Sequence, residues 1–204
     1  TTRLLNHIMK FVGHTVGMCT TEGVYIKNRL IYEGDMTGPL SHKMVLTDPT
    51  VDMAVLECAR GGMLRAGLGF RYCDVGIVTN VSADHLGQNY INDLEKMSRV
   101  KGIVPEVVKP EGYAILNADD SLVAKMSNQT KGNVIYFSLD YKSNSIVKEH
   151  LKSGGMAIIF EEGTFCIIKG KWKYPLIEAK DVPITFDGKA RFNIENVLAA
   201  IGAA

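Results

Sequence analysis

The sequence lacks the features that mark several large classes of protein. Its 204 residues include only four cysteines, and none of them forms a CxxC pair. That absence argues against a zinc knuckle and a disulfide framework, and it fits a reducing compartment. No apolar run approaches the roughly 18 residues of a membrane span, and the amino end carries no signal-peptide pattern. We therefore expect a soluble, cytoplasmic protein without a membrane partner.

An excess of charge of either sign is also missing. The chain has 23 basic and 22 acidic residues, which leaves a formal net charge of +1. No basic stripe with interleaved aromatic residues is present, so we expect no nucleic-acid partner. Hydrophobic residues make up 46% and charged residues 22% of the chain, as in an ordinary globular protein long enough to bury a substantial core.

Helix-like and strand-like segments alternate along the chain. Apolar residues at helical spacing predict a first helix that stops near Gly13, and 23–32 reads as a hairpin around Lys27–Asn28. Further helices are expected at 39–48, 93–108, 121–127 and 193–204, and strands at 14–20, 51–59, 73–81, 112–120 and 132–139. This order predicts an α/β fold with a doubly wound, mostly parallel sheet flanked by helices, and a small antiparallel β-rich excursion at about 155–187.

Polar side chains follow two of the apolar runs, at the carboxyl ends of strands where doubly wound sheets bind ligands. Glu57 precedes a glycine pair and could hold a hard cation beside a phosphate. It could equally cap a helix or pair with Arg60 or Arg65. In "TNVSADHLG", Asp84 is either a turn residue or a ligand, and His85 is either a solvent-facing histidine or a metal ligand.

The helix at 93–108 contains an anomaly. Asn92 and Glu95 have capping-box spacing, and an apolar stripe runs through Met97, Val100 and Val104. Lys101 falls inside this stripe. A lysine that faces a core must snorkel, pair or lose its charge, so these outcomes and a chemically modified lysine remain alternatives.

Two further groups of polar residues have two interpretations each. Asn193 and Asn196 stand three residues apart at a predicted helix start, where Asn193 is a good N-cap. A pair of amides on one face could also bind the edge of a nucleobase. Asp35 and Thr37 lie in "GDMTGP", which is either an ordinary turn or a substrate-contacting loop.

Taken in order, "LECARGG", "TNVSADHLG", "RVKGI", "LNADD" and "FNIENVLAA" resemble the central ATP-binding domain of the Mur ligase superfamily, along nearly the whole chain. "TTEGVYI", "GDMTGP", "VLECARGGMLRAGLGF" and "TNVSADHLG" are similar to the carboxyl-terminal ligase half of the cyanophycin synthetase branch. That branch builds a polymer of aspartate with arginine on each side-chain carboxyl. The resemblance implies an ATP-dependent ligase that forms an amide through an acyl phosphate, with an amino acid and a peptide polymer as substrates.

The resemblance also implies roles for single residues. Glu57, His85 and Lys101 would be the catalytic and magnesium-binding residues, with Lys101 carbamylated as in many members. Thr1 would lie where the first helix receives the phosphates of ATP. Asn193 and Asn196 would contact the adenine, with Phe192 where many relatives have histidine. Asp35, Thr37 and Arg60 would contact the substrate.

Two parts of the family pattern do not occur in these residues. The phosphate loop G-x-x-x-x-G-K-[ST] is missing, and so is the family's further carboxyl-terminal domain. We therefore expect residues 1–204 to be a fragment of this domain, and we expect the fragment to be inactive in isolation. Whether the full-length enzyme forms a homo-oligomer stays open. The alternatives are another Mur-type ligase, acting on a peptidoglycan precursor or a folate, and a non-catalytic module that binds a nucleotide or a partner.

Overall fold

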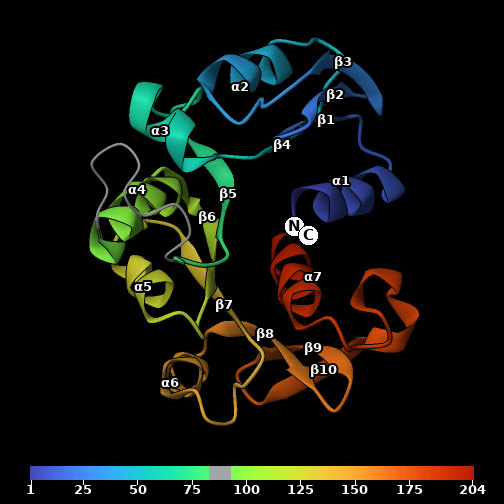
Figure 1. Ribbon diagram of the computed structural model, residues 1–204. Coiled ribbons are helices and arrows are strands. Elements are labelled where there is room, and N and C mark those ends of the chain that lie inside the picture. The colour runs from blue at the N-terminus through green and yellow to red at the C-terminus, as the bar shows by residue number, and fades with distance from the viewer. Residues whose placement is uncertain (83–92) are drawn as a thin grey trace. The chain divides into compact units, whose positions relative to one another are not determined.

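A computed structural model describes residues 1–82 and 93–204, which form two compact units (Figure 1). The first unit comprises Thr1–Arg71 with Ala204, and the second comprises Tyr72–Ala203. Each unit contains its own hydrogen-bonded sheet with helices packed against it. The predicted α/β fold is thus confirmed, although the strands are divided between two sheets.

The first unit has a four-stranded sheet with the order β3–β2–β1–β4. Its strands are β1 (Val16–Thr20), β2 (Gly23–Ile26), β3 (Arg29–Glu33) and β4 (Met53–Leu56). β1 pairs parallel with β4 and antiparallel with β2, which in turn pairs antiparallel with β3. The helices of this unit are α1 (Thr2–Phe11), α2 (Pro39–Leu46) and α3 (Arg60–Ala66).

The hairpin predicted around Lys27–Asn28 is present between β2 and β3. Both residues have positive φ, 50° for Lys27 and 67° for Asn28. A two-residue hairpin turn needs positive φ at both positions because this backbone twist matches that of the flanking strands.

Alternating residues of β1 form the core of the first unit. Val16 and Met18 pack with Met9 of α1, whereas Cys19 packs with Val45 of α2. All five residues of β1 are buried, since the strand is sandwiched between the two helices. Because β4 pairs with this buried strand, the end of β4, which Glu57 follows, has a fixed position in the first unit.

The second unit has a six-stranded sheet with the order β10–β9–β8–β7–β6–β5. β5 (Cys73–Val78), β6 (Val108–Asn117), β7 (Asn133–Ser138) and β8 (Met156–Glu161) pair parallel. β9 (Thr164–Lys169) and β10 (Trp172–Glu178) continue the sheet antiparallel. The β-rich excursion predicted at about 155–187 therefore extends the edge of this sheet.

Helices cover both faces of the second sheet. α7 (Arg191–Ala203) packs on β6, β7 and β8, where a Cβ on Gly202 would lie 2.9 Å from the side chain of Ile115. The opposite face packs against α4 (Leu94–Glu106), α5 (Ser121–Ala124) and α6 (Ser145–Lys152). The described part of this unit also contains short 3₁₀ helices at Lys125–Asn128, Ala179–Asp181 and Pro183–Thr185.

Some local predictions differ from the structure. α4 ends at Glu106 and β6 begins at Val108, so the helix predicted to 108 is two residues too long. The N-cap of α4 is Asp93, whose side chain accepts the Lys96 N–H at 2.7 Å, rather than Asn92. α3 and α6 were not predicted.

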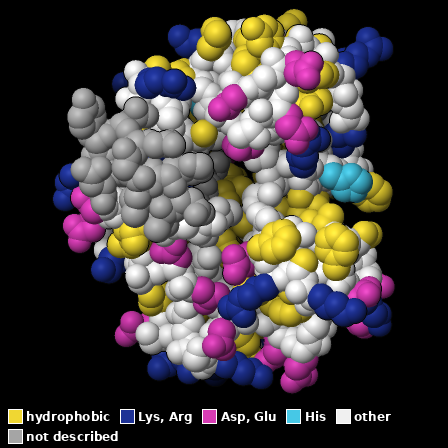
Figure 2. Space-filling model, in the orientation of Figure 1, with side chains coloured by type: hydrophobic (Ala, Val, Ile, Leu, Met, Phe, Trp, Pro, Cys, Tyr) yellow, Lys and Arg dark blue, Asp and Glu magenta, His cyan; other side chains and the backbone are white. Residues whose placement is uncertain are grey.

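The surface agrees with the balanced composition. On the face shown in Figure 2, Lys and Arg side chains are interspersed with Asp and Glu and form no continuous basic stripe. Within the described part of the chain, no helix is both long enough and apolar enough to cross a bilayer.

Candidate functional site

Glu57 directly follows β4, and its backbone is held on both sides. Its N–H donates to the Cys19 carbonyl at 3.1 Å, which continues the parallel pairing of β1 with β4. Its own carbonyl oxygen lies 3.1 Å from Nε2 of His42. The half-buried side chain therefore starts from a fixed backbone position.

Acidic and basic side chains both act on Glu57. Burial raises the pKa of Glu57, the charges of Asp35 and Glu22 raise it further, and the charge of Arg3 opposes them. A partly desolvated carboxylate near other carboxylates gains from a bound cation, and Mg²⁺ is commonly held by one or two protein carboxylates. Glu57 therefore fits a magnesium ligand. Among residues 1–82 and 93–204, however, no three His, Cys, Asp or Glu side chains gather into a ready-made metal site.

Thr1 lies at the amino end of α1, where its carbonyl accepts the Leu5 N–H at 3.0 Å. Thr1 also lies within electrostatic reach of Glu57. The structure thus brings together Thr1 and Glu57, two residues that the sequence analysis placed in one site.

The predicted substrate loop packs against the start of α3. Thr37 is buried, and its hydroxyl donates to the Asp35 carboxylate at 2.7 Å. The Thr37 carbonyl accepts the Ala59 N–H at 3.2 Å, directly before the half-buried Arg60. A Cβ on Gly62 would lie 2.9 Å from the same carbonyl, so the close approach of loop and helix requires glycine there.

A cavity of about 280 Å³ lies beside this loop. Its lining includes Asp35 and Gly38 from the loop, and Gly62 and Arg65 from α3. The three predicted substrate residues, Asp35, Thr37 and Arg60, therefore belong to one neighbourhood of the first unit. Their role in substrate binding remains a prediction.

In the second unit, Lys101 of α4 is half-buried, and its Nζ donates to the Asn80 carbonyl at 2.6 Å. Of the outcomes that the sequence left open, the structure thus shows a paired lysine that holds the backbone after β5. Its carbamylation and its role as a metal ligand remain predictions.

Two neighbouring backbone groups are held in the same way by a side chain at the end of β6 and by one just after it. The buried Asn117 donates from Nδ2 to the Thr79 carbonyl at 2.8 Å. Asp120 accepts the Val81 N–H at 2.6 Å and also caps α5 through the Leu122 and Val123 N–H groups. Together with Lys101, these side chains fix residues 79–81. Sequence reasoning noted "LNADD" but did not assign this role.

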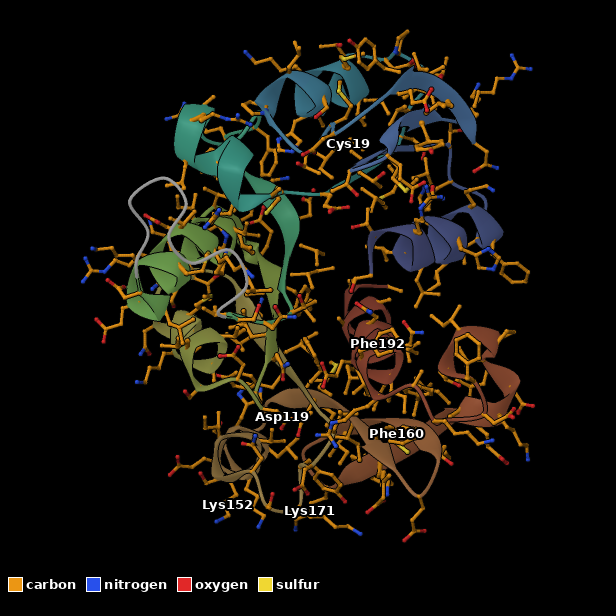
Figure 3. The ribbon with its side chains drawn as sticks, viewed as in Figure 1. Cys19, Asp119, Lys152, Phe160, Lys171 and Phe192 are labelled. Atoms are coloured by element: carbon orange, nitrogen blue, oxygen red, sulfur yellow. The ribbon has the colours of Figure 1, made fainter. Side chains whose placement is uncertain are left out.

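Asp119 uses its carboxylate differently from Asp120. It accepts hydrogen bonds from the Ser138 hydroxyl at 2.6 Å and from the Leu139 N–H, and so joins the ends of β6 and β7 (Figure 3). Its charge also adds to the burial that raises the pKa of Glu195 on α7.

Asn193 is not the N-cap of the last helix, because α7 begins at Arg191 and Asn193 lies in its first turn. Its Nδ2 instead donates to the Ile184 carbonyl at 2.6 Å. Asn196 lies one turn further along and is half-buried, whereas Phe192 is 67% exposed (Figure 3). Adenine binding by the two asparagines remains a prediction. Asp84 and His85 lie outside the described residues, so the metal role predicted for His85 also remains one.

Comparison with known proteins identifies the family. The Mur ligase middle domain matches residues 1–204, and the chain belongs to this family. Cyanophycin synthetase of Crocosphaera subtropica is 53% identical over 204 residues, and that of Geminocystis herdmanii is 48% identical over the same length. The match covers 100% of this chain and 23% of each relative, so the chain spans about a quarter of their length.

A solved UDP-N-acetylmuramoyl-L-alanyl-D-glutamate–2,6-diaminopimelate ligase has the same fold. The TM-score is 0.69 at 20% identity, over 99% of this chain and 40% of that one.

Proposed function

We propose that the intact protein is an ATP-dependent ligase of the cyanophycin synthetase type. It adds arginine to the aspartate side-chain carboxylates of a poly-aspartate backbone. The observation that carries this proposal is the identity of 53% to a cyanophycin synthetase along the entire chain. The half-buried Glu57, with the carboxylates of Asp35 and Glu22 acting on it, supports the magnesium dependence of such a reaction.

Residues of the first unit have distinct tasks in this proposal. Glu57 would hold Mg²⁺ at the end of β4, and the N–H groups in the first turn of α1, next to Thr1, would bind the phosphates. Asp35, Thr37 and Arg60 contact the acceptor polymer. When bound, ATP would supply its γ-phosphoryl group to the substrate carboxylate, giving an acyl phosphate and ADP, and Mg²⁺ would neutralise charge on the phosphates. The α-amino group of arginine would then attack the acyl carbon, expel phosphate and lose a proton to form the amide. The protein's contribution is to position charges and to neutralise them.

Residues of the second unit have roles of their own in this proposal. Lys101, Asn117 and Asp120 fix residues 79–81, and His85 follows this segment as a second metal ligand. Carbamylated Lys101 would add an anion beside residues 79–81. Asn193 and Asn196 bind the adenine. Nδ2 of Asn193 already donates to the Ile184 carbonyl, and the side-chain oxygen of Asn193 can accept a hydrogen bond from the adenine amino group.

A cytoplasmic location belongs to the same proposal. None of the four cysteines, all of which lie in the described residues, forms a disulfide, and Cys19 and Cys166 are buried. Burial raises the pKa of Cys19, and it raises that of Cys73 to about 11, which keeps these groups in the protonated thiol form. Buried thiols that form no disulfide fit a reducing compartment.

The test compares two Glu→Gln variants of the intact protein in ATP- and arginine-dependent phosphate release. Glu57→Gln should lower the rate by at least about a hundredfold, in the range of losses caused by removing one electrostatic transition-state contact. Glu33→Gln, at an exposed position of β3, is the matched control and should keep the wild-type rate. Equal rates for the two variants would refute the role of Glu57. Release with a UDP-linked peptide but not with an aspartate–arginine polymer would refute the proposed substrate.

A further inference from the structure

A histidine that the sequence did not single out connects three segments of the first unit. His42 lies on α2 and is completely buried. Its Nδ1 accepts the N–H of Gly69 at 3.1 Å, and its Nε2 lies 3.1 Å from the carbonyl oxygen of Glu57. An amide N–H can only donate and a carbonyl can only accept. The two partners together therefore select the neutral tautomer with the proton on Nε2.

The packing around the ring leaves it little freedom. A Cβ on Gly69 would lie 2.5 Å from Cβ of His42 and 2.5 Å from the Pro39 carbonyl, so the segment at Gly69 approaches α2 as closely as only glycine permits. The ring of Phe70 lies 5.4 Å from the imidazole, centroid to centroid, and Sγ of Cys58 lies 3.9 Å from Nε2. The imidazole is therefore fixed by α2, by the end of β4 and by the residues after α3.

We propose that His42 is a positioning residue for the cation-binding carboxylate of Glu57. The hydrogen bond from Nε2 holds the Glu57 carbonyl, and thereby the peptide planes from which the Glu57 side chain starts. The bond to Gly69 keeps the ring in the orientation and tautomer that this task needs. The inference rests on the proposed function, because it assigns His42 its role through Glu57.

Two substitutions separate the two hydrogen bonds. The side-chain oxygen of asparagine can take the place of Nδ1 and accept from Gly69, but His42→Asn has no donor that reaches Glu57. The side-chain nitrogen of glutamine can take the place of Nε2 and donate to Glu57, but His42→Gln has no acceptor at the Nδ1 position. Each variant therefore keeps one bond. The exposed His7→Asn on α1 serves as the control for a loss of imidazole.

The readout is the Mg²⁺ concentration that half-saturates ATP-dependent phosphate release by the intact protein, measured together with the KM for arginine and the melting temperature. We expect His42→Asn to raise the Mg²⁺ requirement by roughly tenfold, the effect of losing one buried hydrogen bond, with the KM for arginine unchanged. The Mg²⁺ requirement of His42→Gln should stay within about threefold of that of the wild type, even though this variant also loses a buried hydrogen bond and has a lower melting temperature. His7→Asn should change neither quantity.

The outcomes are distinguishable. If the two His42 variants shift the Mg²⁺ requirement equally, or in proportion to their melting temperatures, the ring has only a packing role and the inference is wrong. If Glu57→Gln itself leaves the Mg²⁺ response unchanged, the proposed function of Glu57 fails, and the role of His42 fails with it.

Should His42→Asn not fold, the wild-type protein carries the test. Adding Mg²⁺ with ATP should slow amide hydrogen exchange at Gly69 as well as around Glu57, because the imidazole links the two. Slowing around Glu57 alone would overturn the inference.

Discussion

Two adjacent glycines of α3 differ sharply in the space around them, which makes a prediction with an internal control. A Cβ on Gly61 would meet nothing closer than the Arg65 guanidinium at 4.0 Å. A Cβ on Gly62 would lie 2.9 Å from the Thr37 carbonyl and 3.0 Å from Cα of Gly38. Both of these contacts are with backbone, which cannot move aside as a flexible side chain would. Gly61→Ala and Gly62→Ala should therefore have opposite effects.

The magnitudes follow from helix propensity and packing. Replacing glycine by alanine in a helix gains up to about 1 kcal/mol at either position. At Gly62 this gain is set against overpacking, which costs about 1–3 kcal/mol. Because the propensity gain is the same for both, the difference between the variants isolates the contact with Thr37 and Gly38. We expect Gly61→Ala to stabilise α3 and Gly62→Ala to destabilise it, with a difference of about 1–3 kcal/mol.

Native-state hydrogen exchange of peptides covering residues 59–68 measures the local opening free energy of α3. The same variants should separate in activity, since Gly62→Ala displaces the loop that carries Asp35 and Thr37. Its KM for the polymer substrate should rise while that of Gly61→Ala stays unchanged. Equal shifts of exchange in both variants, or a stabilised Gly62→Ala, would refute the close packing of loop and helix.

Three further predictions concern single side chains. Because burial raises the pKa of Glu57, its ionised carboxylate costs stability as pH rises through the folded-state pKa. Without Mg²⁺, Glu57→Gln should therefore melt at a higher temperature than the wild type near neutral pH, and this difference should vanish below about pH 4. A difference in melting temperature that is independent of pH would contradict this. Burial lowers the pKa of His150, so the wild type should lose stability as pH falls below about 6.5. In thermal melts between pH 6.5 and 5, the melting temperature of His150→Leu should fall less steeply than that of the wild type. Parallel falls would show that His150 is not responsible. Asp120→Ala removes a helix cap together with the acceptor for the Val81 N–H, and should lower the free energy of unfolding by about 2–4 kcal/mol. Asp93→Ala, which removes only an exposed cap, should lower it by about 1 kcal/mol. Amide hydrogen exchange at residues 79–82 should accelerate in Asp120→Ala alone.

Periodicity and strand ends predicted the elements that dominate the structure. The apolar run before Glu57 forms β4, which is half-buried apart from the buried Val55 and pairs with the fully buried β1, so Glu57 follows at the carboxyl end of that strand. The turn at Lys27–Asn28 was predictable because two strand-like arms with only two residues between them form a tight hairpin.

Elements whose local signal conflicts with their tertiary contacts were missed. α3 contains Gly61 and Gly62, which disfavour a helix by propensity, but the packing of Gly62 against the loop at Thr37 requires that choice. Asn193 has the chemistry of an N-cap, yet α7 begins two residues earlier and its amide bonds to Ile184. His42 gave no sequence signal, because its partners at Glu57 and Gly69 are 15 and 27 residues away.

The central claim is that the intact protein joins arginine to an aspartate polymer through an acyl phosphate. The direct test is incorporation of labelled arginine into an aspartate–arginine polymer in the presence of Mg²⁺ and ATP, with the nucleotide products quantified. We predict incorporation that forms ADP and phosphate in step with each arginine added, and that is lost in Glu57→Gln. The formation of AMP and pyrophosphate, or the absence of incorporation by a folded intact protein, would contradict the account.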